Sequence, residues 1–269
     1  MQITMTVFLA LLLAINSIMI FQLRDRKRTD IIRHLRNMAL GVAGIILPEM
    51  VILLTKDRQI AYCAFTVYYI AFAWYAMMIF RFSVSYSGYK LYKVYKSPLF
   101  WITVIESAAL IWGMFSESFF TIAHAKWYEH IYWISRPFSI FYIYAIVGYL
   151  TLTGAVVVLI IAATQSARIY RLKYSGIAII VALIVASRAN SQLRQQPILV
   201  QVVCFALCEI VIVYMAVYYA PRKLNQRAMR FVADKLNDGI VLYDDEHQLQ
   251  FVTAGYSNAV GPGLKEYRE

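Results

Sequence analysis

The chain has few of the residues that carry catalytic chemistry. Only 15 of its 269 residues are acidic, four are His and three are Cys. It contains no Gly-rich phosphate loop, no His-Glu-x-x-His motif and no Cys-x-x-Cys motif. We therefore find no catalytic centre in these residues, and we expect neither a cofactor nor a bound metal.

The three cysteines, Cys63, Cys204 and Cys208, all lie in apolar runs. Cys204 and Cys208 share one helical face, but two thiols alone make a poor metal site, so the sequence favours packing roles for them. The last apolar run, near 197–220, contains no Lys. A retinal Schiff base therefore has no attachment point there.

Long polar stretches are scarce too, because 61% of the chain is apolar and its mean hydropathy is +0.59. Soluble domains are roughly half apolar, so the lipid bilayer is the predicted partner of this chain. A helix needs roughly 17–25 apolar residues to cross a bilayer. Seven runs are mostly near that length, the sixth being short: 3–22, 38–55, 60–80, 98–115, 138–163, 175–187 and 197–220. The predicted fold is an all-α membrane protein with a seven-helix transmembrane bundle.

Positive charge is concentrated in alternate gaps between these runs, and the net charge is +11. Eighteen of the 26 basic residues lie in the first, third and fifth gaps and after the seventh run: Arg24, Arg26, Lys27, Arg28, Arg33, Arg36, Arg81, Lys90, Lys93, Lys96, Arg168, Arg171, Lys173, Arg222, Lys223, Arg227, Arg230 and Lys235. The other gaps hold two each, the sixth having Arg188 and Arg194. This asymmetry predicts a plasma-membrane protein with its N-terminus outside and its C-terminus in the cytoplasm. Anionic lipid headgroups explain the charge more economically than nucleic acid, which we do not expect as a partner.

The composition changes after the seventh run. Apolar residues follow helical spacing through 221–238, which predicts a cytoplasmic linker helix ending at Asp238-Gly239. These residues are Leu224, Ala228, Phe231, Val232 and Leu236. They form either the seam of a homodimer or a face that packs on the following segment.

Two short β-type runs follow, at 240–243 and 249–252, and a polar turn separates them. This pattern predicts a hairpin. A lone hairpin is marginal in water, and the last 17 residues cannot supply a core around it. We therefore expect that 239–269 is the beginning of an incomplete domain.

The segment FVADKLNDGIVLYDDEHQLQFV resembles the entry into a PAS domain. The whole arrangement resembles the N-terminal seven-transmembrane sensor region of bacterial histidine kinases and some diguanylate cyclases. The resemblance implies a sensor domain over 1–220, a linker helix over 221–238 and an incomplete α/β PAS-like segment over 239–269. It also implies a sensory input module that acts on a cytoplasmic output domain, although no kinase or cyclase motif occurs in these residues.

Three carboxylates lie inside apolar runs: Glu49, Glu106 and Glu209. An ionisable group at bilayer depth costs at least roughly 2.5 kcal/mol, so each is expected to face the bundle interior. They form either a polar, stimulus-responsive site or hydrogen bonds that fix helix registry. In a rival interpretation they lie on the substrate path of a small transporter or channel.

The longest external gap holds His124 and His130 beside Trp127 and Trp133. Two His with neighbouring Glu could bind a metal or respond to external pH. Tryptophan at a membrane face is more typical of an aromatic belt, and a third metal ligand is not evident. The sequence therefore favours the belt, and the stimulus itself stays unknown.

Overall fold

Seven long helices make up most of the computed structural model, which describes residues 2–24, 30–89, 97–116, 118–127, 130–166, 168–194, 198–218, 241–243 and 249–252. The helices are α1 (Gln2–Arg24), α2 (Asp30–Leu54), α3 (Arg58–Tyr86), α4 (Pro98–Ser116), α5 (Ser139–Gln165), α6 (Arg168–Arg194) and α7 (Ile198–Val213), and α7 continues into the π-helical turn η2 (Tyr214–Tyr218). Each helix is long and apolar enough to cross a bilayer, which confirms the predicted helical bundle and indicates a multi-pass membrane protein.

The bundle is apolar outside, and its interior combines aliphatic and aromatic residues with a smaller set of polar ones. Helix α3 is the most enclosed, whereas α1 and α4 are the least. Large apolar side chains such as Trp112, Phe115 and Ile143 are mostly exposed. Buried residues include Arg188 and Glu209. This distribution suits a lipid environment, where apolar side chains face the solvent and polar ones face other helices.

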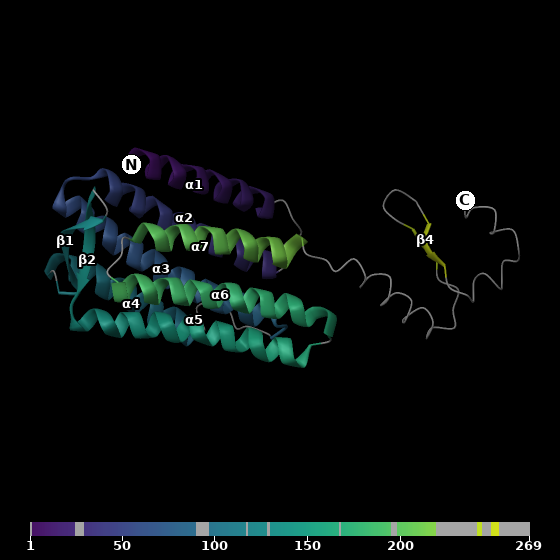
Figure 1. Cartoon of the computed structure of the whole chain (residues 1–269). Coiled ribbons are helices and arrows are strands. Elements are labelled where there is room, and N and C mark those ends of the chain that lie inside the picture. Colours follow the sequence, from purple (N-terminus) through teal and green to yellow (C-terminus); the bar gives the residue numbers. More distant parts are fainter. Residues whose placement is uncertain are drawn as a thin grey trace, which may run out of the picture. The chain divides into compact units, whose positions relative to one another are not determined.

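A β-hairpin covers one end of the bundle. Its strands, β1 (Phe120–Trp127) and β2 (His130–Pro137), pair antiparallel, with Phe120 opposite Pro137. Figure 1 shows the hairpin at the end where α1 begins. The sequence predicted only an external loop here, because its aromatic residues are typical of a membrane belt. The strand alternation is present, however, since Phe120, Ile122, Tyr132 and Ile134 are buried.

The sixth span is longer than predicted. The sequence placed it at 175–187 and assigned Arg188 and Arg194 to an external gap, but α6 runs from Arg168 to Arg194. Arg188 lies inside this helix and is only 2% exposed. The prediction was wrong because a charged residue usually marks the end of a span, and here it faces the bundle interior instead.

The C-terminal segment is described only at its two strands. β3 (Val241–Tyr243) and β4 (Leu249–Val252) pair antiparallel with an irregularity at Leu242 and Tyr243, which confirms the predicted hairpin. The chain divides into two units, Met1–Tyr218 and Tyr219–Glu269. The predicted linker helix lies outside the described residues, and so do its apolar positions Leu224, Ala228, Phe231, Val232 and Leu236.

Close packing of α2 on α3 at Gly41 gives a first testable prediction. A Cβ atom at Gly41 would lie 3.3 Å from Cβ of Tyr75, which is fully buried. Gly41→Val should therefore force the helices apart and lower the free energy of unfolding by about 1–3 kcal/mol. Thermal unfolding in lipid nanodiscs measures the effect. Leu40→Val places the same side chain at an exposed position and should change little. Equal stability of the two variants would contradict this packing.

Candidate functional site

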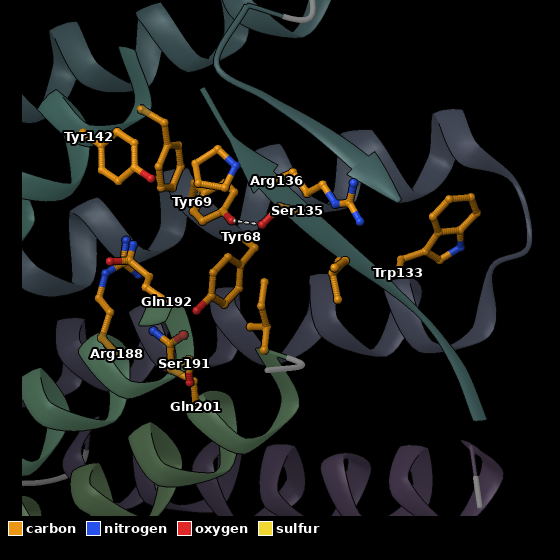
Figure 2. Close-up of a pocket in the computed structure, with 14 residues that line it drawn as sticks. Tyr68, Tyr69, Trp133, Ser135, Arg136, Tyr142, Arg188, Ser191, Gln192 and Gln201 are labelled. Atoms are coloured by element: carbon orange, nitrogen blue, oxygen red, sulfur yellow. Dashed lines mark hydrogen bonds between the residues drawn. The ribbon is translucent and has the colours of Figure 1, made fainter. Parts of the chain in front are cut away.

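A polar cavity of about 480 Å³ lies beneath the hairpin. Its wall is formed by β2 and by residues from four helices, α3, α5, α6 and α7, as Figure 2 shows. The lining residues are Tyr68, Tyr69, Trp133, Ile134, Ser135, Arg136, Pro137, Phe141, Tyr142, Arg188, Ser191, Gln192, Ile198 and Gln201. Sites for small molecules typically measure roughly 300–1,000 Å³, so this cavity has the size of a ligand site.

The cavity is positively charged. Two of the described lining residues are arginines, the exposed Arg136 of β2 and the buried Arg188, and none of those described is Asp or Glu. Within the described part of the chain, the ion pair found is Arg33 with Asp30, which are both on α2. The charge of Arg188 therefore has no carboxylate of these residues at ion-pair distance.

The Arg188 side chain is held by aromatic rings. Its guanidinium carbon lies 3.6 Å from the centre of the Phe72 ring and 5.8 Å from that of Tyr144, and the Tyr144 hydroxyl also lies beside it. A desolvated cation over a ring gains about 2 kcal/mol. The Nε and Nη2 atoms, however, hydrogen-bond to no described residue. Burial of a charge with incomplete partners costs several kcal/mol, more than the rings return.

Two further buried donors border the same cavity. The Tyr68 hydroxyl and the Gln201 side-chain amide nitrogen also have no hydrogen-bond partner in the described part of the chain. Figure 2 shows Tyr68, Arg188 and Gln201 lining one space. Each of these unpartnered atoms can donate a hydrogen bond. A buried polar group without a partner costs about 1–3 kcal/mol, so the cavity is chemically suited to a group that accepts hydrogen bonds.

Several contacts fasten the hairpin to the helices. The Tyr69 hydroxyl hydrogen-bonds the Ser135 hydroxyl, and Trp133 Nε1 donates to the Thr55 carbonyl at 3.1 Å. The Tyr62 and Phe120 rings stack with centres 4.6 Å apart. Burial raises the pKa of the neighbouring Tyr132 phenol, which keeps it neutral. The hairpin thus forms one wall of the cavity and bonds directly to α3.

The three predicted carboxylates lie in different surroundings, and none lines the cavity. Glu49 and Glu209 are buried, and the Tyr75 hydroxyl lies 3.5 Å from Glu209 Oε2. Glu106 is partly buried and interacts electrostatically with Arg188. Cys204 and Cys208, one turn apart, have their sulfurs 3.9 Å from each other, close to Glu209.

Of the four external candidates, the structure brings Trp133 to the cavity wall. The centres of the His124 and Trp133 rings lie 3.7 Å apart, and the two residues are opposite each other on β1 and β2. The side chains of Trp127 and His130 lie outside the described residues. Among the side chains that are described, no group of three or more His, Cys, Asp or Glu could hold a metal ion.

The central residues of the cavity were not predicted from the sequence. The sequence assigned Arg188 to a gap and did not single out Tyr68 or Gln201. One signal was available: Arg188 and Ser191 lie three residues apart, on one face of a continuing helix. A polar face at the end of an apolar run indicates a helix that extends further with that face turned inward.

No protein-family model matches this chain, and no curated protein shows significant similarity to it. Function is therefore inferred from the cavity and from the arrangement of the spans.

The stability of Arg188 variants tests the unfavourable burial of its charge. Arg188→Met removes an incompletely paired cation and keeps an unbranched side chain against Phe72, so it should raise the free energy of unfolding by about 1 kcal/mol or more. The measurement is thermal unfolding in nanodiscs without added ligand. Arg136→Met, at an exposed position, should change stability by at most about 0.5 kcal/mol. A large loss of stability in Arg188→Met would show that Arg188 is a structural residue.

Proposed function

We propose that this chain is the membrane-embedded sensory input module of a bacterial signal-transduction protein and that the cavity beneath the hairpin receives the stimulus. The observation behind the proposal is a polar, ligand-sized cavity at one end of a bundle whose last helix lines it. The segment after that helix resembles a PAS entry, which implies a histidine kinase or diguanylate cyclase as the output.

Helix α7 supplies the proposed route of the signal. Ile198 and Gln201, in its first turn, line the cavity, and the helix continues to Val213 and the π-helical turn Tyr214–Tyr218. Single π-helical turns occur frequently at functional sites. A ligand that contacts Gln201 would favour one of two packings of α7 against α6 and α2, and residues 219–240 would carry the difference onward.

The charge distribution supports an outward-facing cavity. Arg24, Arg33, Arg36, Arg171 and Lys173 all lie at the ends of their helices that are remote from the hairpin. The sequence placed Arg188 in the external gap between the sixth and seventh runs. Because Arg188 is buried inside the bundle, the surface at the hairpin end carries one cation fewer than predicted. The positive-inside rule then favours the hairpin and the N-terminus outside, with α7 ending at the cytoplasmic face.

Orientation can be tested with single cysteines on either side of α3. In a background with Cys63, Cys204 and Cys208 replaced by Ala, Lys56→Cys and Tyr89→Cys place thiols at exposed sites beyond its two ends. In intact cells, a membrane-impermeant maleimide should label the first and not the second, and permeabilisation should expose both. The reverse pattern in intact cells would contradict the proposed orientation.

The coupling of the cavity to the last helix can be tested without knowing the ligand. In the same cysteine-free background, Ser191→Cys places a thiol in the buried wall of the cavity, and a methanethiosulfonate reagent would add bulk there. The adduct should change hydrogen–deuterium exchange of α7 and of residues 219–240, measured on the full chain in nanodiscs.

Lys56→Cys with the same adduct is the matched control, because it modifies an exposed loop at the same end of the bundle. It should leave exchange in α7 and 219–240 unchanged. If the Ser191→Cys adduct altered exchange only around the cavity, a sensor that signals through α7 would be excluded.

A further inference from the structure

We infer that the cavity binds a small organic anion, a carboxylate or a phosphate ester with an apolar body, and that Arg188 is its charge anchor. This inference deepens the proposed function by naming the chemical class of the stimulus. Three buried side chains at the cavity carry hydrogen-bond donors without a partner among the described residues, and all of these donors suit a ligand that accepts hydrogen bonds. The three residues are Tyr68, Arg188 and Gln201.

The two unpartnered atoms of Arg188 define the geometry of recognition. Nε and Nη2 are the donors on one edge of the planar guanidinium, and their N–H bonds run parallel. This edge matches the two oxygens of a carboxylate or phosphate in a bidentate pair. The ring of Phe72 lies over a face of the guanidinium and not against this edge, and the edge is buried without a hydrogen-bond partner among the described residues.

The charge of the cavity favours an anion over a neutral ligand. No acidic residue lines it among the residues that the structure describes, and Arg136 adds a second guanidinium at its exposed edge. Charge interactions are stronger in a poorly hydrated site than in water, because the effective dielectric constant is lower. Arg136 would draw anions toward the opening, while Arg188 would bind them inside.

The remaining wall of the cavity suits an organic group. Tyr69, Trp133, Phe141 and Tyr142 present aromatic surface, and a cavity of about 480 Å³ exceeds the needs of a bare inorganic anion. The Tyr68 hydroxyl and the Gln201 amide can donate to oxygens that the Arg188 edge does not reach. Either a dissolved molecule or the headgroup of an anionic lipid offers this chemistry.

The test compares matched anionic and neutral probes. The full chain in nanodiscs of zwitterionic lipid is titrated with benzoate and phenyl phosphate, and with benzamide and benzyl alcohol as neutral counterparts. Tryptophan fluorescence, to which Trp133 contributes, and the unfolding temperature report binding. The anions should bind saturably and raise the unfolding temperature, whereas the neutral compounds should bind at least about 10-fold more weakly.

Two variants identify the anchor. Arg188→Met should weaken binding of the anions by about 30-fold or more, because the bound charge loses its buried partner. Arg171→Met, at an exposed position on the same helix, should leave binding unchanged. Equal binding of benzoate and benzamide, or unchanged anion affinity in Arg188→Met, would overturn the proposal.

A lipid arm distinguishes the two sources of the anion. Nanodiscs containing phosphatidylglycerol should stabilise the wild-type chain more than Arg188→Met, and should compete with benzoate, if a lipid headgroup is the natural ligand. If only the soluble anions show this dependence on Arg188, the ligand is a dissolved molecule. If neither soluble anions nor anionic lipid stabilise the wild type more than Arg188→Met, anion recognition is refuted. The Ser191→Cys adduct tests the coupling of the cavity to α7 without any anion. Failure of anion recognition can therefore be told apart from failure of the proposed sensor function.

Discussion

The permanent charge of Arg188 inside a helical bundle is the constraint on which the rest of the site depends. A guanidinium cannot lose its proton in a protein, so burial must be offset by the groups around it. The Phe72 and Tyr144 rings supply part of this compensation. What they leave unsatisfied is an edge with two donors, beside a cavity whose described lining residues include no carboxylate. The hairpin then acts as more than a connection between α4 and α5, because β2 forms the wall facing Arg188.

Tyrosine is abundant in this chain, with 21 residues, and the cavity shows one reason why. A phenol packs like an apolar ring and still donates a hydrogen bond. Tyr144 donates to the Tyr69 carbonyl at 2.7 Å, while Tyr69 bonds the hairpin through Ser135. These contacts link α5, α3 and β2 without introducing a charge. Tyrosines can therefore enclose the cavity without adding a charge of their own, and its positive charge comes from the arginines.

Local patterns in the sequence predicted the seven spans and the C-terminal strand pair, because hydropathy and alternation are set by neighbouring residues. The external hairpin and the extent of α6 depended on contacts between distant elements. In the sequence, Arg188 resembles a residue that ends a span. Only the structure shows that its guanidinium packs on the ring of Phe72, more than a hundred positions earlier. The sequence marked the carboxylates Glu49, Glu106 and Glu209 as costly at bilayer depth, yet it could not place them relative to one another. The cavity instead gathers Tyr68, Arg188 and Gln201, whose joint position only tertiary packing determines.

The energetic scale of a buried ion pair bears on the proposed role of Arg188 in a switch between two packings. To reverse a two-state equilibrium from 1:99 to 99:1, a ligand must favour one state by about 5.5 kcal/mol. Contacts with a desolvated charge are worth about 2–5 kcal/mol, so the proposed anion on Arg188 would supply a large part of this difference if only one state presented the donor edge. The two donors lie on different helices, Gln201 on α7 and Arg188 on α6, so their separation depends on how these helices pack. An anion held by both residues fixes the distance between the two helices, and any packing with a different distance loses one of the contacts.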